Sequence, residues 1–261
     1  MVVVPFDKRL KTDFYIPINK CLNAKHNDRV IVKILDWPSA AKCPFGEIKK
    51  LLGTSGEASS EIHSIIHKHN IKEVFSKGTI SYVESLNMKL QSSDYKNRKD
   101  FRGKCCFTID PEDAKDFDDA LSVKLIKPNV YEIGVHIADV SHYVRPNSPI
   151  DKDAMERGCS IYLANKVIPM LPEKLANTLC SLRPLEDKLC FSIVFNINTK
   201  GEVLSHWGGK TIIQSLKRFT YQEAQSLLNQ NTGEFIKELK VLDSISRKLR
   251  KKRIKKDRKS V

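Results

Sequence analysis

The sequence predicts a mixed α+β chain in which a small all-β barrel precedes a larger domain of strands and helices. Three observations indicate this division. Short β-branched and aromatic runs separated by turn residues extend to about residue 55. Longer strand patterns and helical patterns begin at residue 105, and a polar, charged stretch lies before them. We therefore expect a barrel domain at 1–85, a linker at 86–104 and a second domain at 105–261.

The barrel is expected to consist of short strands. Residues 2–4 are β-branched, residues 13–17 alternate between polar and apolar side chains, and residues 29–35 form the strongest strand pattern. Turn signals such as Trp37-Pro38 separate these runs. Several short strands within about fifty residues are typical of a small barrel. Residues 58–69 are expected to form a helix, because isoleucines recur along one face.

Near the N-terminus, three aromatic residues are interleaved with three cations. Aromatic rings can stack on bases while neighbouring cations neutralise phosphates. The alternative is that at least one of the rings belongs to the barrel core. The aromatic residues are Phe6, Phe14 and Tyr15, and the cations are Lys8, Arg9 and Lys11.

The second domain is expected to alternate strands and helices. Apolar, β-branched runs predict its strands, and periodic apolar faces predict its helices. We expect strands at 105–109, 119–125, 131–140, 189–197 and 203–213, and helices at 151–157, 221–229 and 232–251.

Composition excludes several classes of protein. An apolar content of 41% is enough to bury a core, so wholesale disorder is excluded. No run approaches the ~18 consecutive apolar residues of a membrane helix, and no membrane partner is expected. The first residues hold too short an apolar run for a secretory signal. Seven scattered cysteines without a CxxC pair favour a reducing, cytoplasmic setting over a disulfide framework or a zinc site.

The net charge of +14 is concentrated in one segment. Residues 247–259 hold ten Lys or Arg against one Asp, which leaves about +5 for the rest of the chain. Such a run can bind phosphates, or it can be the solvated end of a helix. Both interpretations stay open at this point.

The strongest local feature is an acidic cluster between two predicted strands. It carries six carboxylates within ten residues, and only Lys115 offsets them. Carboxylates held close together raise one another's pKa or need a cation between them. Hard carboxylate oxygens suit magnesium, manganese or calcium. The acidic residues are Asp110, Glu112, Asp113, Asp116, Asp118 and Asp119.

Two other interpretations of the cluster were weighed. A calcium loop of the EF-hand type starting at Asp110 needs glycine at its sixth position and glutamate at its twelfth, where this chain has Lys115 and Leu121. A solvated acidic turn, in which Asp110 or Asp113 caps a short helix, stays open beside the divalent-metal site.

Four segments resemble the RNB family of exoribonucleases, most closely its ribonuclease R branch, in the family's order and approximate spacing. They are TIDPEDAKDFDDA at 108–120, IGVHIADVSHYV at 133–144, RGCSIYLANKVIPMLPEKLANTLCSLRP at 157–184 and KRFTYQEAQ at 217–225. Two earlier segments, VVVPFDKRLKTDFYIP and DRVIVKILDWP, are similar to the strands of the cold-shock module in that branch. The resemblance implies an OB-fold, cold-shock-like barrel followed by the N-terminal part of an α/β RNB catalytic domain.

The resemblance further implies a processive, hydrolytic 3′-to-5′ exoribonuclease. Such an enzyme uses Mg²⁺ and releases nucleoside 5′-monophosphates from single-stranded RNA. The four motif aspartates match Asp110, Asp116, Asp118 and Asp119, which are expected to hold the metal at the scissile phosphate, Asp110 and Asp119 most directly. Tyr162 matches the tyrosine that packs against the terminal nucleotide, although a tyrosine on a predicted strand is by itself more often a core residue.

The remaining motif residues are expected to serve the fold. His136 and His142 lie in a family motif but match no catalytic role, so we interpret them as strand or fold residues. Glu112 and Asp113 match variable positions and are expected to be solvated.

The chain departs from the family pattern at both ends. The family's catalytic domain continues past the point matching Val261, with a catalytic arginine, a further glutamate and an RNA-binding barrel, and Met1 matches a point already inside the cold-shock barrel. We therefore expect an incomplete barrel, low stability and little or no hydrolytic activity for this chain alone. A fragment, an interrupted reading frame and a piece of a split enzyme all fit, and a non-catalytic RNA-binding remnant is the alternative function.

Overall fold

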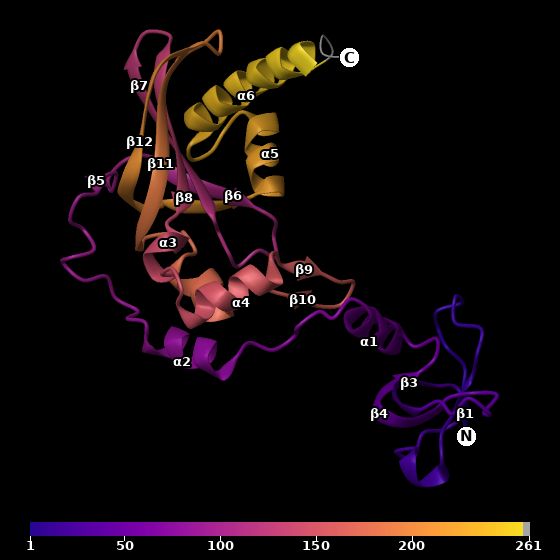
Figure 1. The fold of residues 1–261 in the computed structure, drawn as a ribbon. Coiled ribbons are helices and arrows are strands. Elements are labelled where there is room, and N and C mark those ends of the chain that lie inside the picture. The colour runs from indigo at the N-terminus through magenta and orange to yellow at the C-terminus, as the bar shows by residue number, and fades with distance from the viewer. Residues whose placement is uncertain (258–261) are drawn as a thin grey trace. The chain divides into compact units, whose positions relative to one another are not determined.

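The computed structural model describes residues 1–257 and contains two compact units (Figure 1). The smaller unit consists of residues 1–74 together with 162–168, and the larger unit consists of residues 75–161 and the chain from 169 onward. Arg258 and Lys259, the last residues of the basic run, lie outside the described part of the chain.

A four-stranded sheet forms the smaller unit. Its strands are β1 (Val2–Val3), β2 (Phe14–Tyr15), β3 (Asp28–Asp36) and β4 (Phe45–Thr54), in the order β1-β2-β4-β3. The β3–β4 pair is antiparallel and its register shifts at three places, and such bulges increase the twist of a pair. Gly46 is required in β4 because a Cβ there would lie 2.5 Å from Cγ1 of Val32 on β3. The predicted barrel strands are thus present, and β4 is an additional one.

The core of the smaller unit is compact and apolar. Ile16, Cys21 and Ile48 are buried, and Phe14 packs against them from a half-buried position. The helix predicted at 58–69 is α1 (Ala58–Lys68), and a short 3-10 helix, η1 (Ile18–Lys20), follows β2. Beyond these, β9 (Ile161–Tyr162) and β10 (Val167–Ile168) form a two-stranded hairpin.

The larger unit is built on a seven-stranded sheet. Its four middle strands, β7, β8, β11 and β12, are antiparallel neighbours with long registers, whereas β13 pairs in parallel with β6 and β5 pairs in parallel with β12. In spatial order the strands are β13 (Lys217–Thr220), β6 (Cys106–Asp110), β7 (Asp119–Lys127), β8 (Val130–Ala138), β11 (Asp187–Asn198), β12 (Val203–Gln214) and β5 (Lys99–Asp100).

Helices lie on both faces of this sheet (Figure 1). Side chains alternate along a strand, so Cys106 and Phe107 of β6 point to opposite faces. Cys106 belongs to the core formed with the helices before β11, and Phe107 belongs to the core formed with the last two helices. The helices are α2 (Lys77–Ser85), α3 (Val140–Tyr143), α4 (Pro149–Arg157), the π-helix η2 (Lys174–Leu179), α5 (Tyr221–Gln230) and α6 (Ile236–Asp257).

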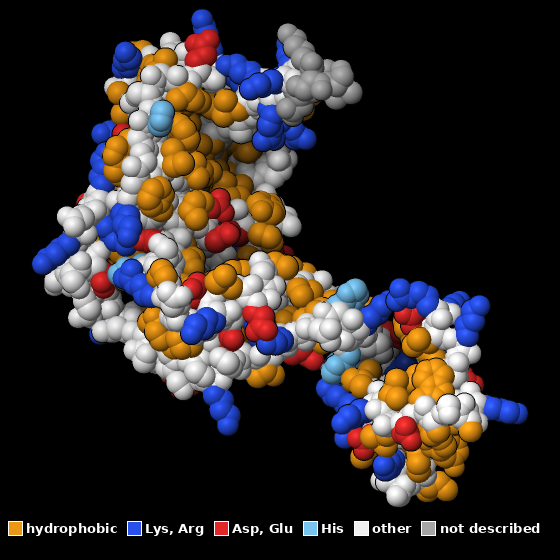
Figure 2. Space-filling model, in the orientation of Figure 1, with side chains coloured by type: hydrophobic (Ala, Val, Ile, Leu, Met, Phe, Trp, Pro, Cys, Tyr) orange, Lys and Arg blue, Asp and Glu red, His pale blue; other side chains and the backbone are white. Residues whose placement is uncertain are grey.

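The last two helices cover only part of their face. Beyond α5 and α6, the side chains of Ile137, Phe191 and Ile193 remain between 44% and 50% exposed. Figure 2 shows hydrophobic side chains spread over the part of the sheet that neighbours α6. This side of the larger unit is therefore apolar and open to contact.

A row of buried polar side chains crosses the middle of the sheet. The ring of His136 on β8 lies between Ser122 on β7 (Nε2 to Oγ, 2.8 Å) and Ser192 on β11 (Nδ1 to Oγ, 2.7 Å). The Ser192 hydroxyl also pairs with the hydroxyl of Thr211 on β12 at 2.5 Å. The row links four adjacent strands, which confirms a fold role for His136.

The structure corrects two of the predicted boundaries and adds a helix. The strand predicted at 131–140 ends at Ala138, because the chain turns into α3. The helix predicted at 232–251 begins only at Ile236, since Gly233 and Phe235 have φ values of 112° and 60°. The added helix is α2, just before the predicted linker, and Ser76 caps it by accepting from the Thr79 N–H. No helix among residues 1–257 is long and apolar enough to cross a membrane.

Candidate active site on the acidic loop

The acidic cluster occupies the connection between β6 and β7. Strand β6 ends at Asp110 and β7 begins at Asp119, so the loop between them is residues 111–118. Asp110 is buried, at 6% exposure, whereas Asp116, Asp118 and Asp119 are exposed. The four motif aspartates therefore belong to one loop and its two flanking strand ends.

The environment of Asp110 disfavours its negative charge. Burial raises the pKa of the Asp110 carboxyl, and the charges of Asp118 and Asp116 raise it further. The nearby Thr108 side chain, and after it the positive charge of Arg218, oppose this shift. Burial also raises the pKa of Asp119, followed by the charges of Asp118 and Asp110, although its side chain keeps access to water. The expectation that these acids raise one another's pKa is met at both positions.

Buried polar atoms without partners gather at the same strand end. Among the described residues, Oδ2 of Asp110, Oγ1 of Thr108 and Nε of Arg218 are buried and have no hydrogen-bond partner. Native proteins leave few such atoms, and each one calls for an explanation, such as an ion or a water. The group therefore points to a polar species that the protein atoms alone do not supply.

The loop is held in place from three directions. The Ser181 hydroxyl accepts from the Phe117 N–H at 3.0 Å and donates to the Lys115 carbonyl at 2.9 Å. The Asp118 carbonyl accepts from the N–H of Ala138 on β8 at 2.9 Å. The guanidinium of Arg218, on β13, donates to the carbonyls of Pro111 and Glu112. These contacts fix the backbone path that carries the aspartates.

The pairing of β13 with β6 also sets the start of α5 beside Asp110. In this parallel register Thr220 lies opposite Asp110. Thr220 caps α5 in a capping box, in which its hydroxyl accepts from the Glu223 N–H and its own N–H donates to the Glu223 carboxylate. The first turn of α5 is thus fixed at the edge of the acidic site.

The donor set suits a divalent cation. Its oxygens are carboxylates, which are hard ligands of the kind that Mg²⁺ prefers, and the partnerless Oδ2 of Asp110 is a ready ligand. Across residues 1–257, no three His, Cys, Asp or Glu side chains lie close enough together to form a complete metal site. The chemistry of the oxygens, and not a preformed cluster, is what fits a cation at this loop.

The other predicted site residue, Tyr162, lies on β9 in the smaller unit. Its side chain is 73% exposed, so the alternative that it is a core residue is wrong. Its role against a terminal nucleotide stays a prediction. His142 pairs with Asp94 at 3.4 Å (Nε2 to Oδ1), and burial lowers the pKa of its imidazole.

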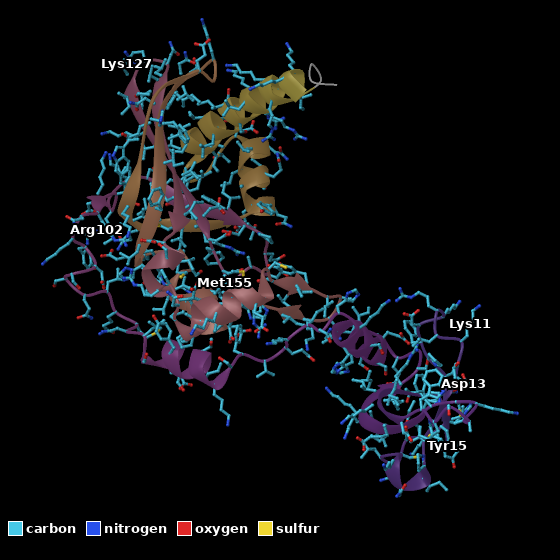
Figure 3. All side chains as sticks on the ribbon, in the orientation of Figure 1. Lys11, Asp13, Tyr15, Arg102, Lys127 and Met155 are labelled. Atoms are coloured by element: carbon cyan, nitrogen blue, oxygen red, sulfur yellow. The ribbon has the colours of Figure 1, made fainter. Side chains whose placement is uncertain are left out.

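The interleaved aromatics of the barrel divide between core and surface. Phe14 packs into the core, as the alternative interpretation predicts, whereas Tyr15 and Phe6 are 43% and 61% exposed. Figure 3 shows Lys11, Asp13 and Tyr15 following one another along one side of the barrel. The three line a surface cavity of about 410 Å³. An exposed ring and a lysine at one cavity are the elements of a single-strand binding surface.

Sequence reasoning did not identify the residues that hold the loop. Arg218 lies in the segment at 217–225 and Ser181 in the segment at 157–184, both of which resemble the family, but neither residue had been given a role. Their partners lie 106 and 66 residues away along the chain, at Glu112 and Lys115. The only available signal was an arginine and a serine within motifs of unassigned function.

Comparison with known proteins agrees with this geometry. The RNB domain family model matches residues 98–261, and the cold shock domain model matches residues 3–76. Ribonuclease R of Thermotoga maritima is 40% identical over 228 residues, which are 87% of this chain and 32% of that protein. This chain spans about a third of the length of the curated relatives that it matches most strongly.

Solved structures show the same fold. Mycoplasma genitalium RNase R in complex with double-stranded RNA has a TM-score of 0.85 at 26% identity, over 95% of this chain and 45% of that one. The complex of the same enzyme with ribose-methylated single-stranded RNA has a TM-score of 0.83 at 26% identity, over 93% and 38%. The predicted fold class, a cold-shock-like barrel followed by a mixed α/β RNB domain, is confirmed. The chain belongs to the RNB domain family, and a cold shock domain precedes its RNB part.

Proposed function

We propose that this chain supplies the metal-binding acidic loop of a hydrolytic 3′-to-5′ exoribonuclease. The enzyme would depend on Mg²⁺, degrade single-stranded RNA and release nucleoside 5′-monophosphates. One observation carries the metal role: Asp110 keeps a carboxylate oxygen without a partner, and burial together with the neighbouring acids raises its pKa. RNB nucleases in general depend on divalent metals, which supports the same assignment.

Each aspartate has a distinct place in the proposal. Asp110 and Asp119, at the two strand ends, hold the metal most directly, and the exposed Asp116 and Asp118 complete its ligands or orient the attacking water. When bound, Mg²⁺ polarises the scissile phosphate and lowers the pKa of the attacking water. Contacts within the chain hold the backbone of the loop, so the aspartates would present a fixed arrangement to the metal and the scissile phosphate.

The RNA-binding role rests on exposed aromatic rings and cations. Tyr162, exposed on β9, would stack against the terminal base, and Tyr15 with Lys11 would contact the strand on the barrel. The RNase R structure with single-stranded RNA supports RNA as the substrate. We also propose the predicted domain limits of 1–85, 86–104 and 105–261.

A non-catalytic RNA-binding module is the second candidate. It is favoured by the absence, among residues 1–257, of three metal-ligating side chains already gathered together. Such a module would retain RNA in a salt-dependent manner, because phosphate contacts release counterions. It would release no nucleotide at any Mg²⁺ concentration.

Substitution of Asp119 tests the proposed site. In an intact enzyme that contains this segment, Asp119→Asn is expected to weaken Mn²⁺ binding, which is measured from the free-ion EPR signal. It is also expected to lower nucleotide release by about 100-fold, since the metal loses a ligand. RNA affinity, measured by fluorescence anisotropy, should stay near that of the wild type. The matched control is Asp113→Asn, which removes the same charge from an exposed position of the same loop.

The two candidates give different results in this experiment. The catalytic proposal is abandoned if the Asp119→Asn variant binds Mn²⁺ and releases nucleotide like the wild type. If the intact wild-type protein binds RNA in a salt-dependent manner but neither binds Mn²⁺ nor releases nucleotide, the RNA-binding module is supported instead.

A further inference from the structure

The guanidinium of Arg218 contacts both ends of the acidic loop. Its Nη2 donates to the Pro111 carbonyl and to the Glu112 carbonyl, the latter at 2.9 Å. Its Cζ lies 5.4 Å from the centre of the Phe117 ring, within the range of a cation–π contact. One side chain thus joins the beginning of the loop to its end.

The sheet fixes the position from which Arg218 reaches the loop. On β13, Arg218 lies opposite Thr108 of β6, two residues before Asp110. Phe219, the next residue, is buried against Phe107, with the two rings 5.5 Å apart. The base of the arginine is therefore anchored in the core while its tip holds the loop.

Buried polar atoms without a partner lie on the two strands that meet beside the loop. Nε of Arg218, Oγ1 of Thr108 and Oδ2 of Asp110 make up three of the four buried side-chain atoms without a partner among the described residues. They belong to strands that pair directly. Buried polar atoms without a partner cost free energy, so this corner calls for a water or an ion that completes their hydrogen bonds.

We propose that Arg218 is a positioning residue of the metal site. Its planar guanidinium grips two carbonyls and one ring, and so holds the loop in the conformation that brings Asp116 and Asp118 toward Asp110. This inference rests on the proposed metal function of the loop. Arg218 contributes to metal binding through these contacts with the loop, and not through its positive charge.

The two possible roles of Arg218, holding the loop and supplying a positive charge, predict opposite changes in metal affinity when the residue is replaced. Loss of a positive charge beside carboxylates strengthens their attraction for a cation, because one repulsive interaction disappears. Release of the loop weakens cation binding, because residues that orient metal ligands typically contribute 10-fold to 100-fold in affinity. The direction of the change therefore separates the two roles.

Two substitutions of Arg218 use this difference. Arg218→Lys keeps the charge but loses the planar fork that reaches two carbonyls. Arg218→Met removes both charge and grip. Both variants are expected to bind Mn²⁺, added alone and followed by EPR, about 10-fold more weakly than the wild type. The matched control is Lys217→Met, which removes a charge from the neighbouring residue, whose ammonium pairs with Glu234 at 3.1 Å and does not contact the loop.

Hydrogen exchange measured by mass spectrometry reports the grip directly. The Phe117 N–H is bonded to Ser181, so its exchange is slow while the loop is held. Both Arg218 variants should exchange faster in peptides covering 111–119, and peptides of β11 and β12 should be unchanged. Faster exchange throughout the Arg218→Met protein would indicate that this variant unfolds. In that case the Arg218→Lys variant alone tests whether Arg218 holds the loop.

The inference is overturned if Arg218→Lys matches the wild type in Mn²⁺ affinity and in loop exchange, or if Arg218→Met binds Mn²⁺ more tightly with the loop still protected. Those results would make Arg218 a charge or an ordinary fold residue. A wild-type chain that binds no Mn²⁺ would instead refute the proposed function of the loop, and that outcome is seen before any variant is made.

Discussion

The buried imidazole of His136 makes the stability of the fold depend on pH. It is fully buried in the middle of the sheet, and burial lowers its pKa from the ordinary value of 6.5 to about 4. In the unfolded chain the same group takes up a proton near pH 6.5. Between these two pH values the unfolded state binds a proton that the folded state excludes, so the free energy of unfolding falls as the pH falls.

The size of the effect follows from the shift. One pKa unit corresponds to about 1.4 kcal/mol, so a shift from 6.5 to about 4 corresponds to about 3 kcal/mol. This contribution is fully present above pH 6.5 and is lost by about pH 4. Burial is the cause: the ring lies between two serine hydroxyls in the middle of the sheet, away from the water that would stabilise its protonated form.

The assay is urea unfolding at a series of pH values from 4 to 7.5, for the wild type and for His136→Gln. The variant lowers stability at every pH because it disturbs a packed site, but it should lose the part of the pH dependence that belongs to His136. The exposed His206, replaced by Gln, is the matched control and should keep the wild-type pH dependence.

A second measurement on the wild type tests the same prediction if the His136→Gln variant does not fold. NMR of the wild-type imidazole should show His136 neutral at pH 5.5. Equal pH dependence in the wild type and in His136→Gln, or an imidazole that protonates in the folded protein near pH 6.5, would refute the reasoning.

Two further predictions concern the same sheet. Gly134→Ala is expected to cost about 1–3 kcal/mol in urea unfolding, because the new Cβ would lie 2.5 Å from Ser122 Oγ, whereas Gly208→Ala, whose new Cβ would lie 3.8 Å from the Ser192 carbonyl oxygen, should cost little. Arg98→Met should cost about 3–5 kcal/mol, since it leaves Asp139 buried without its 2.6 Å ion pair; an unchanged unfolding midpoint would contradict this.

Local pattern was enough to predict most of the sheet. Apolar and β-branched runs predicted β7, β8, β11 and β12, and each of these strands buries part of its length in a core. Strand β4 was not predicted, since its Lys-Lys-Leu-Leu run breaks the alternation where its register with β3 shifts. Bulges of this kind depend on the partner strand, and a single segment does not reveal them.

The sequence predicted which acidic residues form the candidate site, but not the contacts that hold their loop in place. Six acids between two strands are visible in the sequence, and the strands do place Asp110 and Asp119 at the ends of one loop. The burial of Asp110 and the contacts of Arg218 depend on the pairing of β6 with β13, whose residues are 110 positions apart at the Arg218–Thr108 pair. Pairing over such a distance is set by the whole fold, so no local pattern could have shown it.

The contacts that hold the loop help to explain why the fold tolerates so many negative charges close together. Only Lys115 offsets the acids within the cluster, yet Asp116, Asp118 and Asp119 are exposed, and water screens their repulsion. The backbone, in turn, is held by bonds from Ser181, Arg218 and Ala138 that do not involve the carboxylates. Because protein contacts define the path of the loop, a cation has only to draw side chains together. Asp110 is the least exposed of the four aspartates, and its free oxygen is therefore a point at which a bound cation would offset the cost of a buried charge.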